Sequence, residues 1–213
     1  MTPSSEALAG VTLAAELNTG IGVDAPHVFT PREDRPEAAV ATMSDGRSLV
    51  SVIPGVDTYI LRFRRQDWEW AHGASPDTGA VAEAALAWLA GTGLEEMARR
   101  WPFVEFSELE LAYERGDALE TQWRIVRRDA SEPDRELLEL AARNPTVSRF
   151  FPTLGHNLLL MPDPFDSRIL ASVLLLAPGR FQLWAPGRSE PLAEGPPSTV
   201  ITKLAELLET PED

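Results

Sequence analysis

Two stretches of the sequence end in the same way, and this likeness limits the possible folds more than any other feature of the chain. The segment 67–73 leads into SPDT at 75–78, and the segment 191–195 leads into PST at 197–199; both continuations are typical helix starts. Several short strand-like runs precede each segment. Because self-similarity of this size is typical of a duplicated structural unit, the sequence predicts a ββββα unit that is present twice.

The clearest local signal in the first copy is Asp45-Gly46, which stands between the apolar runs 38–43 and 49–53. An Asp-Gly pair readily adopts the positive backbone angles of a tight two-residue hairpin turn, so we expect Asp45 and Gly46 to form that turn. Residues 58–64 then alternate between two sets of side chains, as a half-buried antiparallel strand does. The prediction for this stretch is a meander of four antiparallel strands.

A helix is expected after this meander, with Ser75 as the residue that caps its first free amides and Pro76 at its first position. The segment 102–150 has mainly helical periodicity, and Ser107 with Glu110 has the pattern of a capping box. Its ambiguous part is 118–128, where the apolar spacing fits a helix better than a strand. We therefore predict a helix there.

The chain is thus predicted to be α+β, with two antiparallel β-meander plus helix units, a possible internal duplication, joined by a mainly helical insert. The expected parts form one compact globular body: an N-terminal helix and loop (1–36), the first unit (37–101), the insert (102–150) and the second unit (151–213). Antiparallel sheets of this class commonly carry helices on one face and leave the other face open. We expect a ligand or partner to bind on that open face.

The charge and the residue inventory exclude several classes of function. The formal net charge of the 213 residues is −14, whereas nucleic-acid-binding proteins generally carry a concentrated basic patch, so neither nucleic acid nor an anionic membrane is expected as a partner. The chain contains no cysteine, which excludes thiol nucleophiles, disulfides and thiolate metal sites. The sequence has no glycine-rich phosphate loop and no nucleophile-elbow motif, and no cofactor is predicted.

The location of the protein is predicted from its terminal and apolar segments. The N-terminal stretch MTPSSEALAG lacks the basic region and the apolar run of a signal peptide. No apolar stretch approaches the roughly 18 residues that would span a bilayer. These observations favour a cytoplasmic protein.

Trp68, Trp70 and His72 form the strongest candidate binding surface in the sequence. In a regular strand alternate residues point to the same face, so these three side chains would lie together. Aromatic rings offer the large, rigid contact areas that are found at protein interfaces. The alternative is that this face is simply core, packed beneath the helix that contains Val81 and Trp88.

His156 follows a Phe-Phe-Pro loop, and Arg149 lies a few residues before it. A histidine near an arginine at a loop–strand junction could serve as an acid or base while the arginine holds a substrate carboxylate. It could equally be a buried side chain whose nitrogens are satisfied by backbone groups. The three histidines do not have the spacing of a zinc site, so no metal is predicted.

Four segments resemble a known family in their order and spacing: WEWAHG at 68–73, AEAALAWLAG at 82–91, RRWPFVEF at 99–106 and FFPTLGHNLLL at 150–160. Together they look like an uncharacterised actinomycete family, a domain of unknown function described as natural-product biosynthesis proteins, and the resemblance spans residues 38–161. It implies an actinomycete source and a link to specialised-metabolite gene clusters, without an established reaction. The residues that follow Phe-Pro in that family are usually small polar or aromatic, whereas here they are TLG at 153–155.

Two functions follow from these observations. The first is a non-catalytic, cytoplasmic binding or accessory protein that recognises a protein or peptide partner through the open sheet face or the acidic helical insert. The alternative is a tailoring enzyme, or an enzyme subunit, of a specialised-metabolite pathway that uses His156 as acid or base. The sequence favours the first function because it contains no catalytic constellation, and it indicates no oligomeric state.

Overall fold

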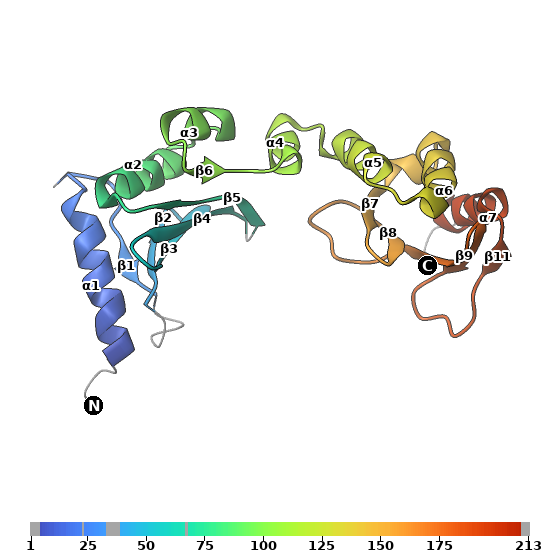
Figure 1. Cartoon of the computed structure of the whole chain (residues 1–213), viewed down its shortest axis with the longest axis horizontal. Helices are drawn as coiled ribbons and strands as arrows, with labels where there is room; N and C mark the ends of the chain where they lie inside the picture. Colours follow the sequence, from blue (N-terminus) through green and yellow to red (C-terminus); the bar gives the residue numbers. More distant parts are fainter. Residues whose placement is uncertain (1–4, 23, 33–38, 67, 210–213) are drawn as a thin grey trace. The chain divides into compact units, whose positions relative to one another are not determined.

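A computed structural model describes residues 5–22, 24–32, 39–66 and 68–209 of the chain (Figure 1). Within these ranges the protein is α+β, with two antiparallel sheets, each followed by a helix, and a helical segment between the sheets. The predicted fold class is confirmed. The chain divides into two compact units, unit 1 (Met1–Glu114) and unit 2 (Arg115–Asp213), and the division falls inside the predicted helical insert.

Unit 1 is built on sheet A, whose strands follow one another in chain order from β1 to β6. Every neighbouring pair is antiparallel. Helix α2 packs on the three central strands β3, β4 and β5, and α1 lies beside α2 against β1 and β2. The elements of this unit are α1 (Ser5–Thr19), β1 (Thr30–Pro31), β2 (Ala41–Ser44), β3 (Ser48–Pro54), β4 (Tyr59–Arg65), β5 (Trp68–Ser75), α2 (Thr78–Leu89), α3 (Leu94–Arg100), β6 (Val104–Glu105) and α4 (Glu108–Arg115).

The β2–β3 turn lies one residue later than the sequence predicts. Ser44 is paired with Leu49, and the Asp45 amide donates to the Ser48 carbonyl, which leaves Gly46 and Arg47 as the central turn residues. Gly46 has a φ of +88°, and a glycine at the first central position is the pattern of a type II′ turn. The Asp45 carboxylate, at a flanking position, accepts hydrogen bonds from the amides of Arg47 and Ser48 at 2.8 and 2.6 Å.

Helix α2 also begins later than predicted. Asp77 is its N-cap, and the Asp77 carboxylate accepts hydrogen bonds from the amides of Gly79 and Ala80. The predicted cap, Ser75, is instead the last residue of β5, where its hydroxyl accepts a hydrogen bond from the Asp77 amide. The prediction was wrong because both residue types cap helices well, and the length of β5 decides which one does so.

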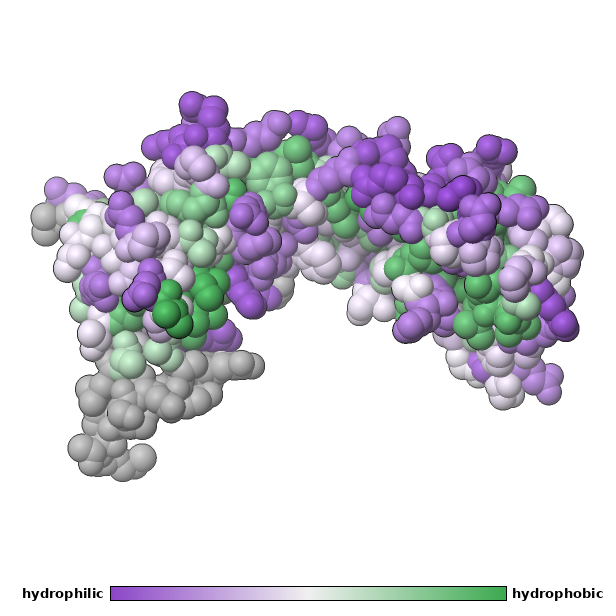
Figure 2. All heavy atoms as spheres, in the orientation of Figure 1, coloured by the Kyte–Doolittle hydropathy of each residue, from purple (hydrophilic) through white to green (hydrophobic). Residues whose placement is uncertain are grey.

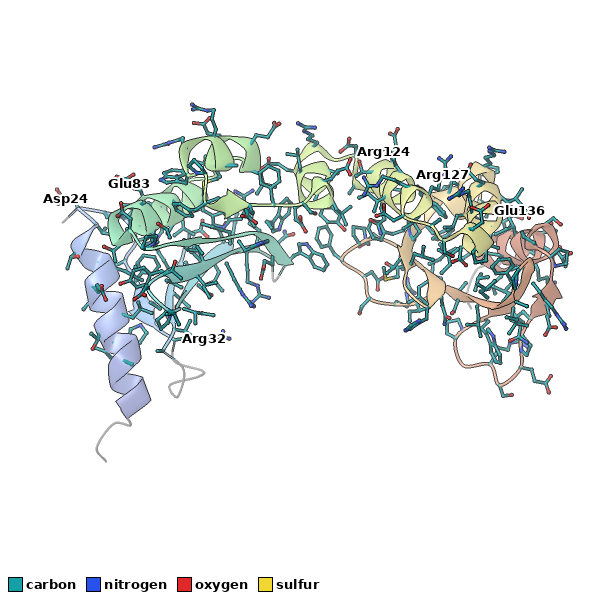
Figure 3. The ribbon with its side chains drawn as sticks, in the orientation of Figure 1. Asp24, Arg32, Glu83, Arg124, Arg127 and Glu136 are labelled. Atoms are coloured by element: carbon teal, nitrogen blue, oxygen red, sulfur yellow. The ribbon has the colours of Figure 1, made fainter. Side chains whose placement is uncertain are left out.

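The core of unit 1 is centred on Trp88 of α2, which is fully buried. The Phe63 ring meets the Trp88 ring edge-on, with 5.7 Å between the centroids. The Arg65 guanidinium lies over the Trp88 ring, 4.0 Å from its centroid, and the Trp88 indole nitrogen donates to the Arg64 carbonyl at 3.2 Å. Glu83 lies on the side of α2 away from sheet A (Figure 3). Helix α2 is therefore amphipathic, with Trp88 on its buried face and Glu83 on its exposed face.

Unit 2 is built on sheet B, in which β7 to β11 again pair in chain order. Helices α5, α6 and α7 cover one face: α5 contacts β7, α6 contacts β9, and α7 contacts β10 and β11 (Figure 1). The segment 118–128 is helical, as predicted. The elements are α5 (Ala118–Arg128), α6 (Glu132–Arg143), the 3₁₀ helix η1 (Val147–Arg149), β7 (Phe151–Leu154), β8 (Asn157–Met161), β9 (Ala171–Ala177), β10 (Arg180–Trp184), β11 (Ala193–Gly195) and α7 (Pro197–Glu209).

The core of unit 2 lies between sheet B and these helices. Trp123 of α5 is buried, and its indole nitrogen lies 3.1 Å from the carbonyl oxygens of both Ser148 and Phe150. The neighbouring Gln122 is also buried and donates to the Pro152 carbonyl at 2.8 Å. The outer side of α5 and α6 is hydrophilic in Figure 2, and Arg124 projects from it in Figure 3.

The two units share an antiparallel meander that is followed by a helix, but not the details of the residues that suggested a duplication. Gly73 lies inside sheet A, where a Cβ atom would come within 2.5 Å of the Phe103 carbonyl oxygen. Gly195 lies on the edge strand β11 with a φ of +154°, and a Cβ atom there would meet Thr199 only at 3.7 Å. One glycine is therefore required by a close approach of backbone and the other by its own backbone conformation.

Candidate binding site in unit 1

The candidate site is a pocket of about 410 Å³ beside β5. Five consecutive residues of the strand, from Trp68 to His72, line one side of it, and Phe106, Ser107 and Glu110 line the other. Successive side chains of a strand point to opposite faces. A pocket that touches five in a row therefore borders the edge of the strand and not only one face. This differs from the expected place, which was the open face of the sheet.

Trp68, Trp70 and His72 do not share one face, because β5 contains a β-bulge. Phe63 is paired with Ala71 and Arg64 with Glu69, so Trp70 has no Cα partner on β4 and is the extra residue. One inserted residue reverses the alternation of side chains on either side of it. The prediction of a single stripe was wrong for this reason.

The bulge places the two tryptophans and the histidine in different surroundings. Trp68 lies opposite Arg65, whose guanidinium stacks on Trp88 of α2, and Trp70 packs partly against the unit 1 core. His72 lies opposite Arg62, on the open face of the sheet, and its side chain is 58% exposed. The alternative that these residues are simply core therefore holds in part for Trp70, whereas Trp68 is 38% exposed.

The Tyr113 ring of α4 packs against the rings of both Trp68 and Trp70. It lies 6.2 Å, centroid to centroid, from each of these rings, with interplanar angles of 84° and 62°. Edge-to-face packing of this kind adds about 0.5–1.5 kcal/mol per pair beyond the area that is buried. The aromatic wall of the pocket is therefore preorganised.

The start of α4 is fixed by the predicted capping box. The Ser107 hydroxyl accepts a hydrogen bond from the Leu109 amide at 3.2 Å, and the Glu110 carboxylate accepts one from the Ser107 amide at 2.6 Å. This reciprocal pair satisfies free amides at the helix start. It also fixes the position of Glu110, which lines the pocket together with residues of β5.

Charged side chains lie around the pocket. His72 Nε2 lies 3.8 Å from a carboxylate oxygen of Glu105, and Glu69 lies 3.7 Å from Arg62 Nε. Of the described residues that line the pocket, Glu69 and Glu110 are acidic and none is lysine or arginine. The pocket therefore combines an aromatic wall with a negative rim.

A second pocket, of about 400 Å³, is also lined by Trp70. It is lined by Asp45 and Arg47 of the β2–β3 turn, by Arg65, and by the end of α2 at Leu89. Hydrogen bonds from the amides of Ser48 and Arg47 hold the pKa of the Asp45 carboxyl below its usual value. Trp70 is thus shared by an acidic pocket and by one that carries two arginines.

The structure separates the two residues of the alternative site. Arg149 is the last residue of η1, before β7, whereas His156 lies at the tip of the β7–β8 hairpin, after it. The distance from Phe151 to Leu154 alone is roughly 10 Å at the usual rise of a strand. Both side chains are exposed, so His156 is not a buried histidine either.

Within the described ranges, no three histidine, aspartate or glutamate side chains come together in a way that could hold a metal ion. In the same part of the chain, none of the helices is both long and apolar enough to cross a bilayer. Comparison of the sequence and the structure with protein-family models, curated proteins and solved structures gave no match. The family resemblance of the sequence therefore stays a prediction.

Sequence reasoning found one side of the pocket and only part of the other. Trp68, Trp70 and His72 were candidates, and Glu110 was one as part of the acidic helical insert, but Phe106, Ser107 and Tyr113 were not. The capping-box pattern correctly indicated where α4 starts. No local signal indicates that this helix start lies beside β5, because the contact depends on the path of the chain through α2, α3 and β6.

Proposed function

We propose that the chain is a non-catalytic binding protein that recognises a protein or peptide partner through the pocket between β5 and α4. The observation that carries this proposal is the aromatic wall of Trp68 and Trp70, which is partly exposed and is held in place by Tyr113. Rigid aromatic side chains at a concave surface are the usual anchors of protein recognition. The acidic rim favours a partner with basic side chains.

An enzymatic function has less support. The tailoring-enzyme hypothesis depended on His156 and Arg149 acting together, and β7 lies between them. A general base and the group that orients its substrate must both reach the reacting atoms. We therefore keep the binding function as the proposal.

The setting of this function is part of the same proposal. A cysteine-free chain suits the cytoplasm, since small extracellular domains are commonly stabilised by disulfides. The net charge of −14 argues against nucleic acid as the partner. A link to actinomycete natural-product biosynthesis is supported by the sequence resemblance alone.

The test is selection of ligands from a random-peptide display library with the purified chain, followed by binding measurements on the chain and two variants. Trp68→Ala removes one exposed aromatic anchor and should weaken binding of the selected peptides by about tenfold or more. Trp184→Ala, which removes a half-buried tryptophan from sheet B, should leave binding unchanged. Peptides that bind equally well to Trp68→Ala, or a library that yields no binder, would contradict the proposal.

A further inference from the structure

We propose that the partner enters the pocket as a short extended segment that pairs with β5 at Glu69–Ala71 and presents a basic side chain to Glu69 and Glu110. This inference rests on the proposed function and specifies how the ligand binds. Strand addition of this kind draws affinity from backbone hydrogen bonds and specificity from alternate side chains.

The pairing of β6 shows where such a segment would lie. β6 pairs with β5 only at His72 and Gly73, which face Glu105 and Val104. Because the two strands are antiparallel, the next residues of a longer β6 would face Ala71 and Trp70. The chain instead turns into α4 at Ser107, whose capping bonds commit it to the helix.

The pocket begins where β6 ends. It borders Trp68–His72 along the edge of β5, and its far wall is made by Phe106, Ser107 and Glu110. At a volume of about 410 Å³ it lies within the range of small ligand pockets, so it can accept a few side chains but not a whole helix. An extended segment is the occupant that fits a strand edge of this length.

The bulge at Trp70 limits the length of the added strand. A bulge bends its strand and increases the local twist, and natural proteins use this to discourage long pairing at sheet edges. Pairing with β5 would therefore be restricted to about three residues at Glu69–Ala71. Most of the specificity must then come from side chains that reach the aromatic wall and the acidic rim.

The charge of the rim selects the chemistry of the segment. Glu69 of β5 and Glu110 of α4 both line the pocket, and no lysine or arginine is among its described lining residues. A lysine or arginine of the partner can meet both carboxylates, while its apolar neighbour packs on Trp68 or Trp70. The overall charge of −14 adds a long-range attraction for such a segment.

The test uses peptides obtained from the display library against the full chain. Each residue of a selected peptide is N-methylated in turn, which removes one backbone donor and leaves the protein unchanged. Strand addition predicts that methylation at alternate positions weakens binding by about tenfold, with little effect at the positions between them. The selected peptides should also be enriched in lysine or arginine.

A pair of protein variants tests the acidic rim. Glu110→Gln removes the charge but keeps an oxygen that can accept the Ser107 amide, and it should weaken binding of a basic peptide by about fivefold. Glu83→Gln, on the far side of α2, should not change binding. Strand addition would be overturned if methylation weakened binding at positions three or four residues apart, or if no methylation weakened it. In either case, weaker binding to Trp68→Ala would still support the proposed function. Loss of the Trp68 dependence itself would overturn the proposed function.

Discussion

The open faces of the two sheets have different chemistry, although both sheets are meanders with helices on one side. On sheet A, two pairs of cross-strand partners on the open face are charged: Arg62 lies opposite His72, and Arg64 lies opposite Glu69, next to the apolar pair Ile60 and Ala74. On sheet B, Leu159 and Trp184 flank Ser172 on the two central strand pairs, and the charged residues Arg180 and Glu194 pair with each other near the edge strand β11. The shared meander and its following helix therefore do not determine what the surface of a unit can bind.

The interiors differ in a similar way. In unit 1 the buried Trp88 is enclosed by Phe63 and by the Arg65 guanidinium. In unit 2 the buried Trp123 reaches two carbonyl oxygens in the segment before β7. Each indole nitrogen finds a backbone acceptor, as buried tryptophans normally do. The two cores are thus built by the same physical rule with different partners.

The largest expected effect tests whether the two cores are energetically separate. Trp88→Ala should destabilise unit 1 by about 3–5 kcal/mol, because it leaves a cavity at the centre of the core. Hydrogen exchange should show lost protection in α2 and β3 and unchanged protection in α7 and β9. Trp123→Ala should give the reverse pattern, and loss of protection in both units from either change would show that the cores are coupled.

Gly73, one of the two glycines that suggested a duplication, gives the next effect. Gly73→Ala should cost about 1–3 kcal/mol, because the new methyl group meets the Phe103 carbonyl and the backbone must shift. Gly22→Ala is the matched control, since a Cβ atom there has no neighbour within 4 Å. Urea unfolding of the two variants measures the difference. Equal midpoints would mean that the β5–β6 contact adapts at no cost.

Helix capping gives a smaller effect that differs between the units. Asp77→Ala should destabilise unit 1 by about 1 kcal/mol, because the Asp77 carboxylate accepts hydrogen bonds from two backbone amides at the start of α2. The N-cap of α6 in unit 2, Ser131, makes no such side-chain bond. Ser131→Ala should therefore change the midpoint of urea unfolding less than Asp77→Ala, and a larger change would contradict this assignment.

The smallest effect is a dependence of stability on pH. The pKa of Asp45 is lowered in the folded state by amide hydrogen bonds from Ser48 and Arg47. Its stabilising contribution is therefore complete above the unfolded pKa of about 3.9 and is lost as the pH falls through the lower folded value. The stability difference between the wild type and Asp45→Asn should shrink over that acid range.

Glu194 of unit 2 sharpens this last comparison. Its pKa is lowered first by a hydrogen bond from Gln182 and then by Arg180. Because part of this effect comes from an exposed cation, added salt should reduce it. The Asp45 effect comes from backbone amides, so it should respond less to salt. Equal salt sensitivity in Asp45→Asn and Glu194→Gln would contradict these causes.

Most of the secondary structure could be predicted because its signals are local. The capping box at Ser107 and Glu110, the helix at 118–128 and the turn glycine at 46 depend on residues that are neighbours in the chain. Some errors were shifts of one or two residues, as at Asp45 and Ser75, which arose where two nearby residues have similar propensities and the pairing of the strands chooses between them. The short strands β1, β6 and β7 were missed altogether, because they lie in segments that have no strand-like alternation.

The sequence by itself determined two meander–helix units, with a helical segment between them, because the alternation of apolar residues and the caps and turns act over a few residues. Only the tertiary structure decided that Trp70 is a bulge, that the start of α4 lies beside β5, and that β7 keeps Arg149 from His156. Each of these depends on the register between strands or on the path of the chain between distant segments. Such contacts are set by packing across the whole unit, and no short sequence pattern encodes them.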